Sequence, residues 1–525
     1  MEADGLAEIV GVQTQYQEMS SIFTPQMIIQ LRRQFRPSLG DEGQLSVATW
    51  NLAAINNNPF EYWISHSDGS YKELMDQVER FIDAPGDRDV AVAEVFPASL
   101  FQELLSLMKA EGWQGLEKVT ALWESDFSKR KIISGVLKEK ELGAKRLCSM
   151  PDRFTNTINI ASGGPVFRPT VINHSTNVLS SVAAWWPQWV DFMFKGSLEM
   201  RTGNNGSTKR IRPCEMLSTI KKAKYPAITE EEEAISVPLQ CLCLAIFDAI
   251  LVHMMQVLSP DGHWLRIKES ICNATFRKKS AITTRILQSY SGCAVICLQE
   301  ASEAYLQSLR QSSLAKTHHI VIPEKVDGQR DQNSALLLSR IAFPLGAEKE
   351  ITDDVVAAVE GSKLEVGDLI AVRATHSSGR RLVVASFHGD TNGQATAPVI
   401  KALQRALSGD ALLFGLDANT YLKGSTSLYG VQEFLQECRG VDFQVCWPED
   451  MEMSKCLTTC NARTFLQPQL NKACPSAKKL EMGDVNPKDH IVFSREAFES
   501  VRVIKDNTGH GEYVEGVCFP SLRFP

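Results

Sequence analysis

The sequence predicts a protein of the α/β (α+β) class that carries a large, mainly helical insertion. After about residue 285, short apolar runs alternate with stretches whose apolar residues have helical spacing, which is the pattern of strands and helices packed in layers. Between residues 56 and 284, helical spacing predominates. This block is large enough to have a hydrophobic core of its own.

The length, composition and net charge of the chain limit which kinds of protein it can be. The chain has 525 residues, which is long for one compact domain, so two structural units or one heavily inserted domain are expected. Its 44% hydrophobic and 22% charged residues are typical of a globular protein. The net charge of -7 excludes a general affinity for polyanions, so a role on nucleic acid requires a local basic patch.

The cysteines predict a reducing compartment. They number thirteen and are scattered, and Met1 to Asp4 begins no apolar signal peptide. We therefore expect an intracellular protein, cytoplasmic or nuclear, with reduced thiols. Cys456 and Cys460 are followed by no second pair at zinc-ligand spacing, so a zinc site is not expected.

One segment, 237–258, is apolar enough to resemble a membrane span. It contains several polar side chains, among them Asp248, and a carboxylate near the middle of a span costs about 2.5–3.5 kcal/mol on insertion scales. We predict a buried helix and no membrane span.

The first part of the chain gives one strand and then helices. Residues 1–40 read as a polar lead-in with a short amphipathic helix. A strand at 44–51 ends at Asn51, and Asn56 to Pro59 breaks the chain. In the block that follows, helical spacing predicts helices at 71–82, 98–111, 116–122, 178–194 and 237–258.

A basic stretch lies within the helical block. Between Lys195 and Lys224 there are eight basic residues against two glutamates, Glu199 and Glu215. Two interpretations stay open at this point, a solvated face and a polyanion-binding patch.

The second part alternates strands with helices. Helices are predicted at 303 onward, 397–407 and 430–437. Buried or half-buried strands are predicted at 294–300, 333–339, 364–374, 381–388, 412–417 and 489–494.

The strand at 412–417 runs into the polar tip Asp417-Ala418-Asn419. Residues two apart in an extended chain point to the same side, so Asp417 and Asn419 would project together. A carboxylate beside a neutral amide suits phosphoryl chemistry, because the carboxylate can orient a water while the amide holds an oxygen. The alternative is a strand that ends in an Asx-type turn.

Polar residues also end the other strands of this part. These strand-tip residues are Asn51, Glu300, His388, Asp417 with Asn419, and Asp489. Such a set is what a cleft at one edge of a packed sheet needs. The oxygens of Asn51 and Glu300 suit Mg²⁺, with Mn²⁺ as the alternative, better than zinc.

The order of these motifs resembles the endonuclease/exonuclease/phosphatase superfamily, the DNase I-like group. The resemblance covers about residues 44–55 and 285–525, and the block between them has no counterpart in compact members. The motifs that carry it are Thr49-Trp50-Asn51, Leu298-Gln299-Glu300, Asn333 to Ser339, Phe387-His388-Gly389-Asp390, Gly415 to Asn419 and Asp489 to Ser494.

The resemblance implies a fold and a domain division. It implies a four-layer α/β sandwich, in which two mainly antiparallel sheets pack face to face with helices outside. The sandwich would comprise 41–55 and 285–525, with 56–284 as an insertion.

The resemblance also implies a role for each matching position. Asn51 and Glu300 match the metal-site amide and carboxylate. Asp417 matches the aspartate that positions the attacking water, Asn419 its companion amide, and His388 a phosphate-contacting histidine. Asp489 matches the aspartate that orients the catalytic histidine, and Asn333 lies in a strand that often faces substrate.

One motif of the family is missing from the sequence. The family ends its domain with Ser-Asp-His, which does not occur between residue 489 and Pro525. Three explanations stay open. The sequence is a fragment, which we favour, or His510 or His490 has taken over, or the protein is a catalytically weak relative that binds phosphates.

The sequence therefore predicts a Mg²⁺-dependent phosphoesterase that hydrolyses a phosphodiester or phosphomonoester. The alternative is a weak or inactive relative that binds phosphate or nucleic acid. RNA, DNA, a nucleotide and a phosphoinositide all remain open as the phosphate-containing substrate, and no oligomeric state is predicted. The segment 460–470 reads either as a substrate-selecting loop or as a structural loop.

Overall fold

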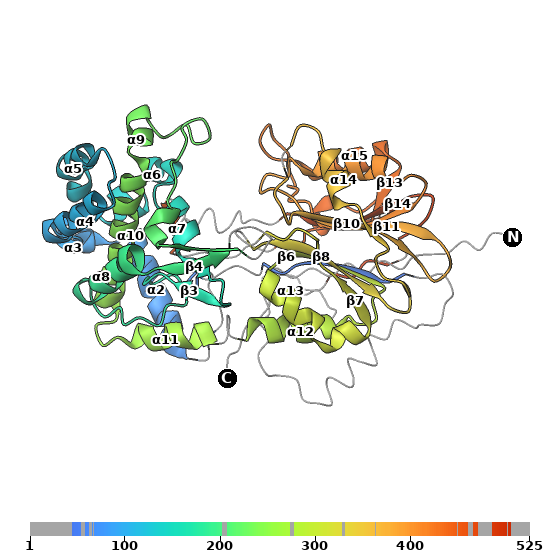
Figure 1. Cartoon of the computed structure of the whole chain (residues 1–525), viewed down its shortest axis with the longest axis horizontal. Coiled ribbons are helices and arrows are strands. Elements are labelled where there is room, and N and C mark those ends of the chain that lie inside the picture. Colours follow the sequence, from blue (N-terminus) through green and yellow to red (C-terminus); the bar gives the residue numbers. More distant parts are fainter. Residues whose placement is uncertain are drawn as a thin grey trace. The chain divides into compact units, whose positions relative to one another are not determined.

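The computed structural model divides the chain into two compact units (Figure 1). The described residues are 45–53, 58–61, 66, 68–201, 207–273, 278–327, 331–362, 364–448, 450–459, 466–470, 486–500 and 502–505. We call the described residues within 1–56, 278–461 and 482–525 the sandwich unit. Those within 57–277 and 462–481 form the helical unit. The predicted lead-in 1–40 lies outside the described residues, as does His510.

The first sheet of the sandwich unit has four strands. Its order is β1 (Val47–Asn51), β6 (Val295–Ala301), β8 (Asn333–Ser339) and β7 (His318–Val321). The β1–β6 pair is parallel, and the other two pairs are antiparallel.

The second sheet has six strands and contains the central stretch of the sequence. Its order is β13 (Phe443–Val445), β14 (Asp489–Ser494), β12 (Ala411–Asp417), β11 (Arg381–His388), β10 (Leu369–Thr375) and β9 (Lys349–Glu350). Only β11 and β12 run parallel among the paired strands of this sheet in the described part of the chain.

Helices cover the outer faces of both sheets (Figure 1). On the four-stranded sheet lie α12 (Lys279–Ser289), α13 (Glu303–Arg310) and the short η7 (Ser313–Lys316). On the six-stranded sheet lie α14 (Thr352–Ala357), α15 (Thr396–Ala406) and α16 (Val431–Gly440), and the loop after β13 contains η8 (Met453–Lys455). The inner faces share one core, because Val295 and Leu336 cluster with Val384 and Leu413. The predicted α/β class and its four layers are confirmed.

The two sheets approach closely at Gly415. A Cβ atom at this position would lie 2.6 Å from Cys297 Cβ and 3.1 Å from Thr49 Cβ, so only glycine fits. Beside this contact, Gln299 of the first sheet donates to Ser386 Oγ of the second at 3.0 Å, and Ser386 Oγ donates to Leu298 O at 2.8 Å. These buried hydrogen bonds fix one alignment of the sheets, because a slipped alignment leaves them unsatisfied.

The helical unit is built around one long helix, α10 (Ser236–Leu258) (Figure 1). The other α-helices of this unit are α2 (Gly69–Asp83), α3 (Val92–Val95), α4 (Ala98–Ala110), α5 (Leu116–Ser125), α6 (Lys140–Lys145), α7 (Ser149–Thr155), α8 (Val182–Val190), α9 (Glu230–Ala234) and α11 (His263–Cys272). Short helical turns are η1 (Gly86–Arg88), η2 (Phe127–Lys129), η3 (Ile133–Leu137), η4 (Asp191–Lys195) and η5 (Pro213–Met216). Two hairpins pair β2 (Thr157–Asn159) with β3 (Pro165–Phe167), and β4 (Leu198–Arg201) with β5 (Thr208–Ile211).

The α10 helix has the length and apolarity of a membrane span, but 78% of its most apolar 18-residue window is buried inside the structure. Its carboxylate, Asp248, is fully buried and accepts hydrogen bonds from Arg168 Nε at 2.8 Å, Thr170 Oγ1 at 2.7 Å and Trp189 Nε1 at 2.9 Å. This network explains how the core helix contains a charge, and it agrees with the predicted buried helix.

Two boundaries differ from the predicted domain division. Residues 279–284 were predicted to belong to the insertion, but they form the first part of α12. This helix belongs to the sandwich unit, because its Ile286 and Leu287 pack against the four-stranded sheet. Residues 466–470, assigned to the sandwich, belong to the helical unit, because Leu466 and Leu470 join its core. The rest of the predicted loop 460–470 lies outside the described residues.

Four of the eight basic residues of this stretch form ion pairs with acids in the described part of the helical unit. Lys195 pairs with Asp191, and Arg212 with Glu111 and Glu215. Further along, Lys221 and Lys222 pair with Glu233 and Glu230. Because these partners offset the positive charge, the geometry favours the solvated face over the polyanion patch.

Gly415→Ala tests the close contact of the sheets. We expect it to lower the free energy of unfolding by about 1–3 kcal/mol, because the added methyl group overlaps Cys297 and the sheets have to separate. Gly440→Ala is the matched control, since a Cβ at the end of α16 meets nothing within 4 Å. Urea unfolding of both variants measures the difference. Equal stabilities of the two variants would refute the close contact.

Candidate active site

The sheet register brings the polar strand tips together. In the six-stranded sheet, His388 pairs with Asp417 across parallel strands, and Asp417 pairs with Asp489 across antiparallel strands. In the four-stranded sheet, Asn51 pairs with Gln299, which is adjacent to Glu300. Because the two sheets pack face to face, these tips meet at one edge of the sandwich unit.

Asn51 links the two sheets at this edge. Its side chain is fully buried, and its Nδ2 donates to Glu300 Oε1 at 3.0 Å and to Asp417 Oδ2 at 2.9 Å. Its Oδ1 accepts from the Ala53 backbone N–H at 2.8 Å. The Ala53 carbonyl in turn accepts from Lys279 Nζ at 2.8 Å. One amide therefore stands between two carboxylates that belong to different sheets.

Glu300 reaches the edge because its strand is irregular. The register shifts between Leu298 and Ala301, and Glu300 has a left-handed backbone with φ 50°. A non-glycine residue in this region is strained, and surrounding contacts have to hold it there. The Glu300 carboxylate lies 3.1 Å from His388 Nε2 and accepts from Gln332 Nε2 at 3.2 Å. Its side chain is 18% exposed, as is that of His388.

Asp417 and Asn419 do not project side by side, contrary to the prediction. Asp417 is the last residue of β12, whereas Asn419 has a left-handed backbone with φ 51° and folds back. The Asn419 backbone N–H donates to Asp417 Oδ1 at 3.0 Å, which is an Asx-type turn. Asn419 Nδ2 donates to Gly389 O at 2.9 Å. The strand therefore ends in an Asx-type turn, and Asp417 of the same turn still lies among the polar strand tips.

Asp489 is a buried carboxyl held by the loop before it. Its Oδ2 accepts from Thr458 Oγ1 at 2.9 Å, while Oδ1 has no hydrogen-bond partner among the described residues. Burial raises the pKa of Asp489 well above its usual range, and the neighbouring negative charge of Asp417 raises it further.

Asn333 has a structural part in the described geometry. Its side chain is fully buried, its Nδ2 donates to Ala301 O at 3.2 Å, and its Oδ1 accepts from Asp327 N at 2.7 Å. These bonds hold the chain just after Glu300. A substrate contact of Asn333 stays a prediction.

His490 faces away from the strand tips and is fully engaged. Its Nδ1 accepts from Trp447 Nε1 at 3.0 Å, so Nε2 carries the proton and lies 2.8 Å from Pro487 O. Its ring packs 4.5 Å from that of Phe434. Successive residues of a strand point to opposite sides, so Asp489 and His490 cannot both face the site. The interpretation of His490 as a replacement for the missing histidine is therefore wrong.

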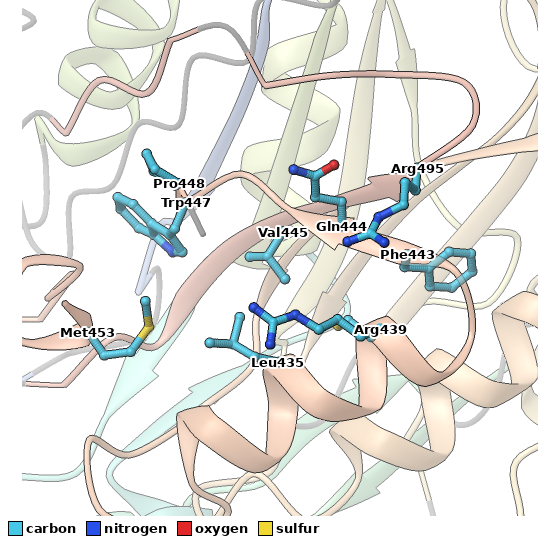
Figure 2. Close-up of a pocket in the computed structure, with 10 residues that line it drawn as sticks. Leu435, Arg439, Phe443, Gln444, Val445, Trp447, Pro448, Met453 and Arg495 are labelled. Atoms are coloured by element: carbon cyan, nitrogen blue, oxygen red, sulfur yellow. The ribbon is translucent and has the colours of Figure 1, made fainter. Parts of the chain in front are cut away.

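A small hollow of about 30 Å³ is lined in part by Trp447 and Pro448 (Figure 2). Figure 2 shows Leu435 and Arg439 of α16 across from Gln444 and Val445 of β13. None of the strand-tip residues lines this hollow, so it is separate from the candidate site.

The described residues contain no group of three or more His, Cys, Asp or Glu side chains arranged to hold a metal ion. The donor set nevertheless fits a hard cation with few protein ligands, because Glu300 and Asp417 approach one another across a single neutral amide. As placed, the Asn51 amide turns its nitrogen toward these carboxylates. Asn51 would serve as an oxygen ligand only with its amide turned over.

Sequence reasoning missed two residues of the site. Gln332 donates a hydrogen bond to Glu300 and directly precedes the Asn333 motif. Its place at the start of that strand could therefore have indicated a site residue. Thr458 lies in an irregular segment rich in Thr, Cys and Pro, where no periodic pattern marks it.

His490 predicts how the stability of the sandwich unit depends on pH. Burial lowers the pKa of His490 from 6.5 to about 3, so between these values the unfolded chain binds a proton that the folded chain does not. Its contribution to stability is therefore lost as the pH falls from about 6.5, by about 1.4 kcal/mol per pH unit. His490→Gln should flatten this dependence by that amount in urea unfolding at pH 5, 6 and 7. An unchanged slope would contradict the buried neutral imidazole.

Comparisons with known proteins give one family model and several solved structures, each matching part of the chain. A family model described as a domain of unknown function matches residues 89–269, within the helical unit. No curated protein matches the chain.

Several solved structures resemble part of the chain. They include D. rerio TDP2 complexed with a single-strand DNA product, which is 13% identical over 43% of this chain and 80% of that one, with a TM-score of 0.29. The human Nocturnin catalytic domain with bound sulfate is 13% identical over 43% and 78%, with a TM-score of 0.29. An endonuclease/exonuclease/phosphatase family protein from Bacteroides thetaiotaomicron is 11% identical over 41% and 73%, with a TM-score of 0.27. With TM-scores below 0.5, these likenesses carry no argument about this chain.

Proposed function

We propose that the sandwich unit is a Mg²⁺-dependent phosphoesterase that hydrolyses a phosphodiester or phosphomonoester. The observation that carries the proposal is the double hydrogen bond of Asn51. Its buried amide joins Glu300 and Asp417 across the two sheets, while His388 lies on the same glutamate. Carboxylate, amide and imidazole groups thus converge at one edge, and these are groups that can position and stabilise a reacting phosphoryl group.

Glu300 would hold the cation, with Mn²⁺ as the alternative ion. Asn51 would assist only with its amide turned over, which exchanges its hydrogen bonds to Glu300 and Asp417 for an oxygen directed at the ion. When bound, the ion would polarise the phosphoryl group and offset negative charge on the leaving oxygen. His388 and Gln332 flank the Glu300 carboxylate at 3.1 and 3.2 Å and restrict how it can turn. A restricted carboxylate favours a defined ligand geometry.

Asp417 would align the attacking water. Its Oδ1 accepts the Asn419 N–H and its Oδ2 accepts the Asn51 amide, so the carboxylate plane is fixed from both ends. Each oxygen keeps a second lone pair for a water O–H. Because Asp417 is almost fully buried, that hydrogen bond would act where little solvent competes.

Asn419 would contact the phosphate. Its amide has two N–H bonds, of which one donates to Gly389 O, and the other would donate to a phosphoryl oxygen. Asp489 would orient a further proton-donating group through its unbonded Oδ1, the part that the family resemblance gives it. His510, a candidate for that donor, lies outside the described residues.

The substrate class stays at the level of phosphate esters, with RNA, DNA, a nucleotide or a phosphoinositide open. An intracellular location is part of the proposal. It is supported by the ten described cysteines, which are all buried and form no disulfide among the described residues.

Activity measurements test the proposal directly. Glu300→Gln and Asp417→Asn should each lower Mg²⁺-dependent hydrolysis of bis(4-nitrophenyl) phosphate or 4-nitrophenyl phosphate by about 10²–10⁴-fold, because each removes a charge that acts on the reacting groups. Glu360→Gln is the matched control, since it removes a carboxylate from a surface ion pair with Arg405. Full activity in both site variants would refute the assignment.

Metal binding can be measured without turnover. Mg²⁺ should raise the melting temperature of the full chain, because a ligand at 100 times its Kd stabilises the folded state by about 2.7 kcal/mol. Glu300→Ala should abolish this rise, whereas Glu360→Ala should keep it. A Mg²⁺ effect without hydrolysis would instead favour the phosphate-binding relative, and a rise that survives in Glu300→Ala would place the ion elsewhere.

A further inference from the structure

The loop that ends at Thr459 brings a hydroxyl group onto Asp489. Thr458 and Thr459 close the described segment 450–459, and Asn486 opens the segment that leads into β14. The backbone N–H groups of both threonines donate to Asn486 O, at 3.0 and 3.1 Å. The two segments are thereby joined side by side directly before Asp489.

The hydrogen bonds that the Thr458 hydroxyl oxygen accepts determine where its proton can be donated. Its Oγ1 accepts the backbone N–H of Lys488 at 2.8 Å and that of Asp489 at 2.9 Å. A hydroxyl oxygen has two lone pairs, so both are used. Its single proton must therefore go to an acceptor, and Asp489 Oδ2 lies 2.9 Å away, closer than Asn486 O at 3.4 Å.

This bond fixes which carboxylate oxygen of Asp489 is available. Oδ2 is bound to Thr458, and Oδ1 has no hydrogen-bond partner among the described residues. Asp489 lies directly opposite Asp417, and directly opposed residues of an antiparallel pair project to the same face of the sheet. The carboxylate is thus on the face of the candidate site, with one oxygen held and one oxygen left for a further group.

We propose that Thr458 is a positioning residue of the active site, which sets the orientation of the Asp489 carboxylate through its hydroxyl group. The inference rests on the proposed phosphoesterase function. Thr458 itself touches neither the substrate nor the ion, and it acts only through Asp489. Without the hydroxyl, Asp489 is free to rotate about its side-chain bond, and the oxygen that faces the reaction is no longer defined.

Thr459 provides a matched control within the same loop. Its hydroxyl accepts from Asn486 N at 2.8 Å and lies 3.2 Å from Asn486 O. Thr459→Val therefore weakens the same junction between the segments while leaving the Thr458–Asp489 bond in place. Thr458→Ser keeps the hydroxyl and removes only a methyl group.

The experiment compares kcat and KM of the full chain and of Thr458→Val, Thr458→Ser and Thr459→Val, with Mg²⁺ and bis(4-nitrophenyl) phosphate. Thr458→Val should lower kcat about tenfold to a hundredfold, the range typical of residues that orient a site's ligands. KM should change little, since no substrate contact is lost. Thr458→Ser should restore kcat to near the wild-type value, and Thr459→Val should leave it near that value.

The outcomes separate the two hypotheses. If the wild-type chain hydrolyses the ester and Thr458→Val does so equally well, the positioning role is overturned while the proposed function stands. If Thr459→Val is impaired as strongly as Thr458→Val, or Thr458→Ser fails to rescue, Thr458 acts only on the fold of the loop and the inference is again overturned. A wild-type chain without hydrolysis overturns the proposed function, and this inference with it.

Discussion

The close contact of the two sheets at Gly415 is the constraint on which the candidate site depends. Asn51 and Glu300 belong to one sheet and Asp417 to the other, and the amide of Asn51 reaches both carboxylates at about the same distance. This is only feasible when the sheets are close and aligned. Gly415 allows the approach because it has no Cβ, and the buried Gln299–Ser386 bond fixes the alignment. The packing of the two sheets in the core therefore determines how the site residues lie relative to one another.

Sequence patterns predicted the parts of the structure that depend on local chemistry. Apolar runs placed β6, β8, β11, β12 and β14, and helical spacing placed α2, α4, α5 and α10. The polar strand tips were also found, because a single polar residue after a buried strand stands out. The predicted strand at 364–374 begins only at Leu369, since Gly367 has φ 90° and interrupts the extended backbone.

What the sequence could not predict depends on contacts between distant residues. The bulge that brings Glu300 to the edge has no local signature, and neither does the left-handed turn that folds Asn419 back onto Asp417. Asn333 and His490 have residue types common in active sites. Only the tertiary hydrogen bonds show that the first holds backbone groups and the second is buried between Trp447 and Phe434.

Backbone strain is also present at this edge of the sandwich unit. Among the described residues, eight non-glycine residues have positive φ, and Ala53, Glu300 and Asn419 are three of them. Each such residue costs roughly 1–3 kcal/mol, which surrounding contacts have to offset. Here the contacts are those of the site itself, since Ala53 binds Asn51 and Asn419 binds Asp417. The contacts that offset this strain are therefore the same contacts that hold the carboxylates close together. The buried Oδ1 of Asp489, which has no hydrogen-bond partner among the described residues, lies on the same face of the sheet as Asp417 and leaves an acceptor there for a further group.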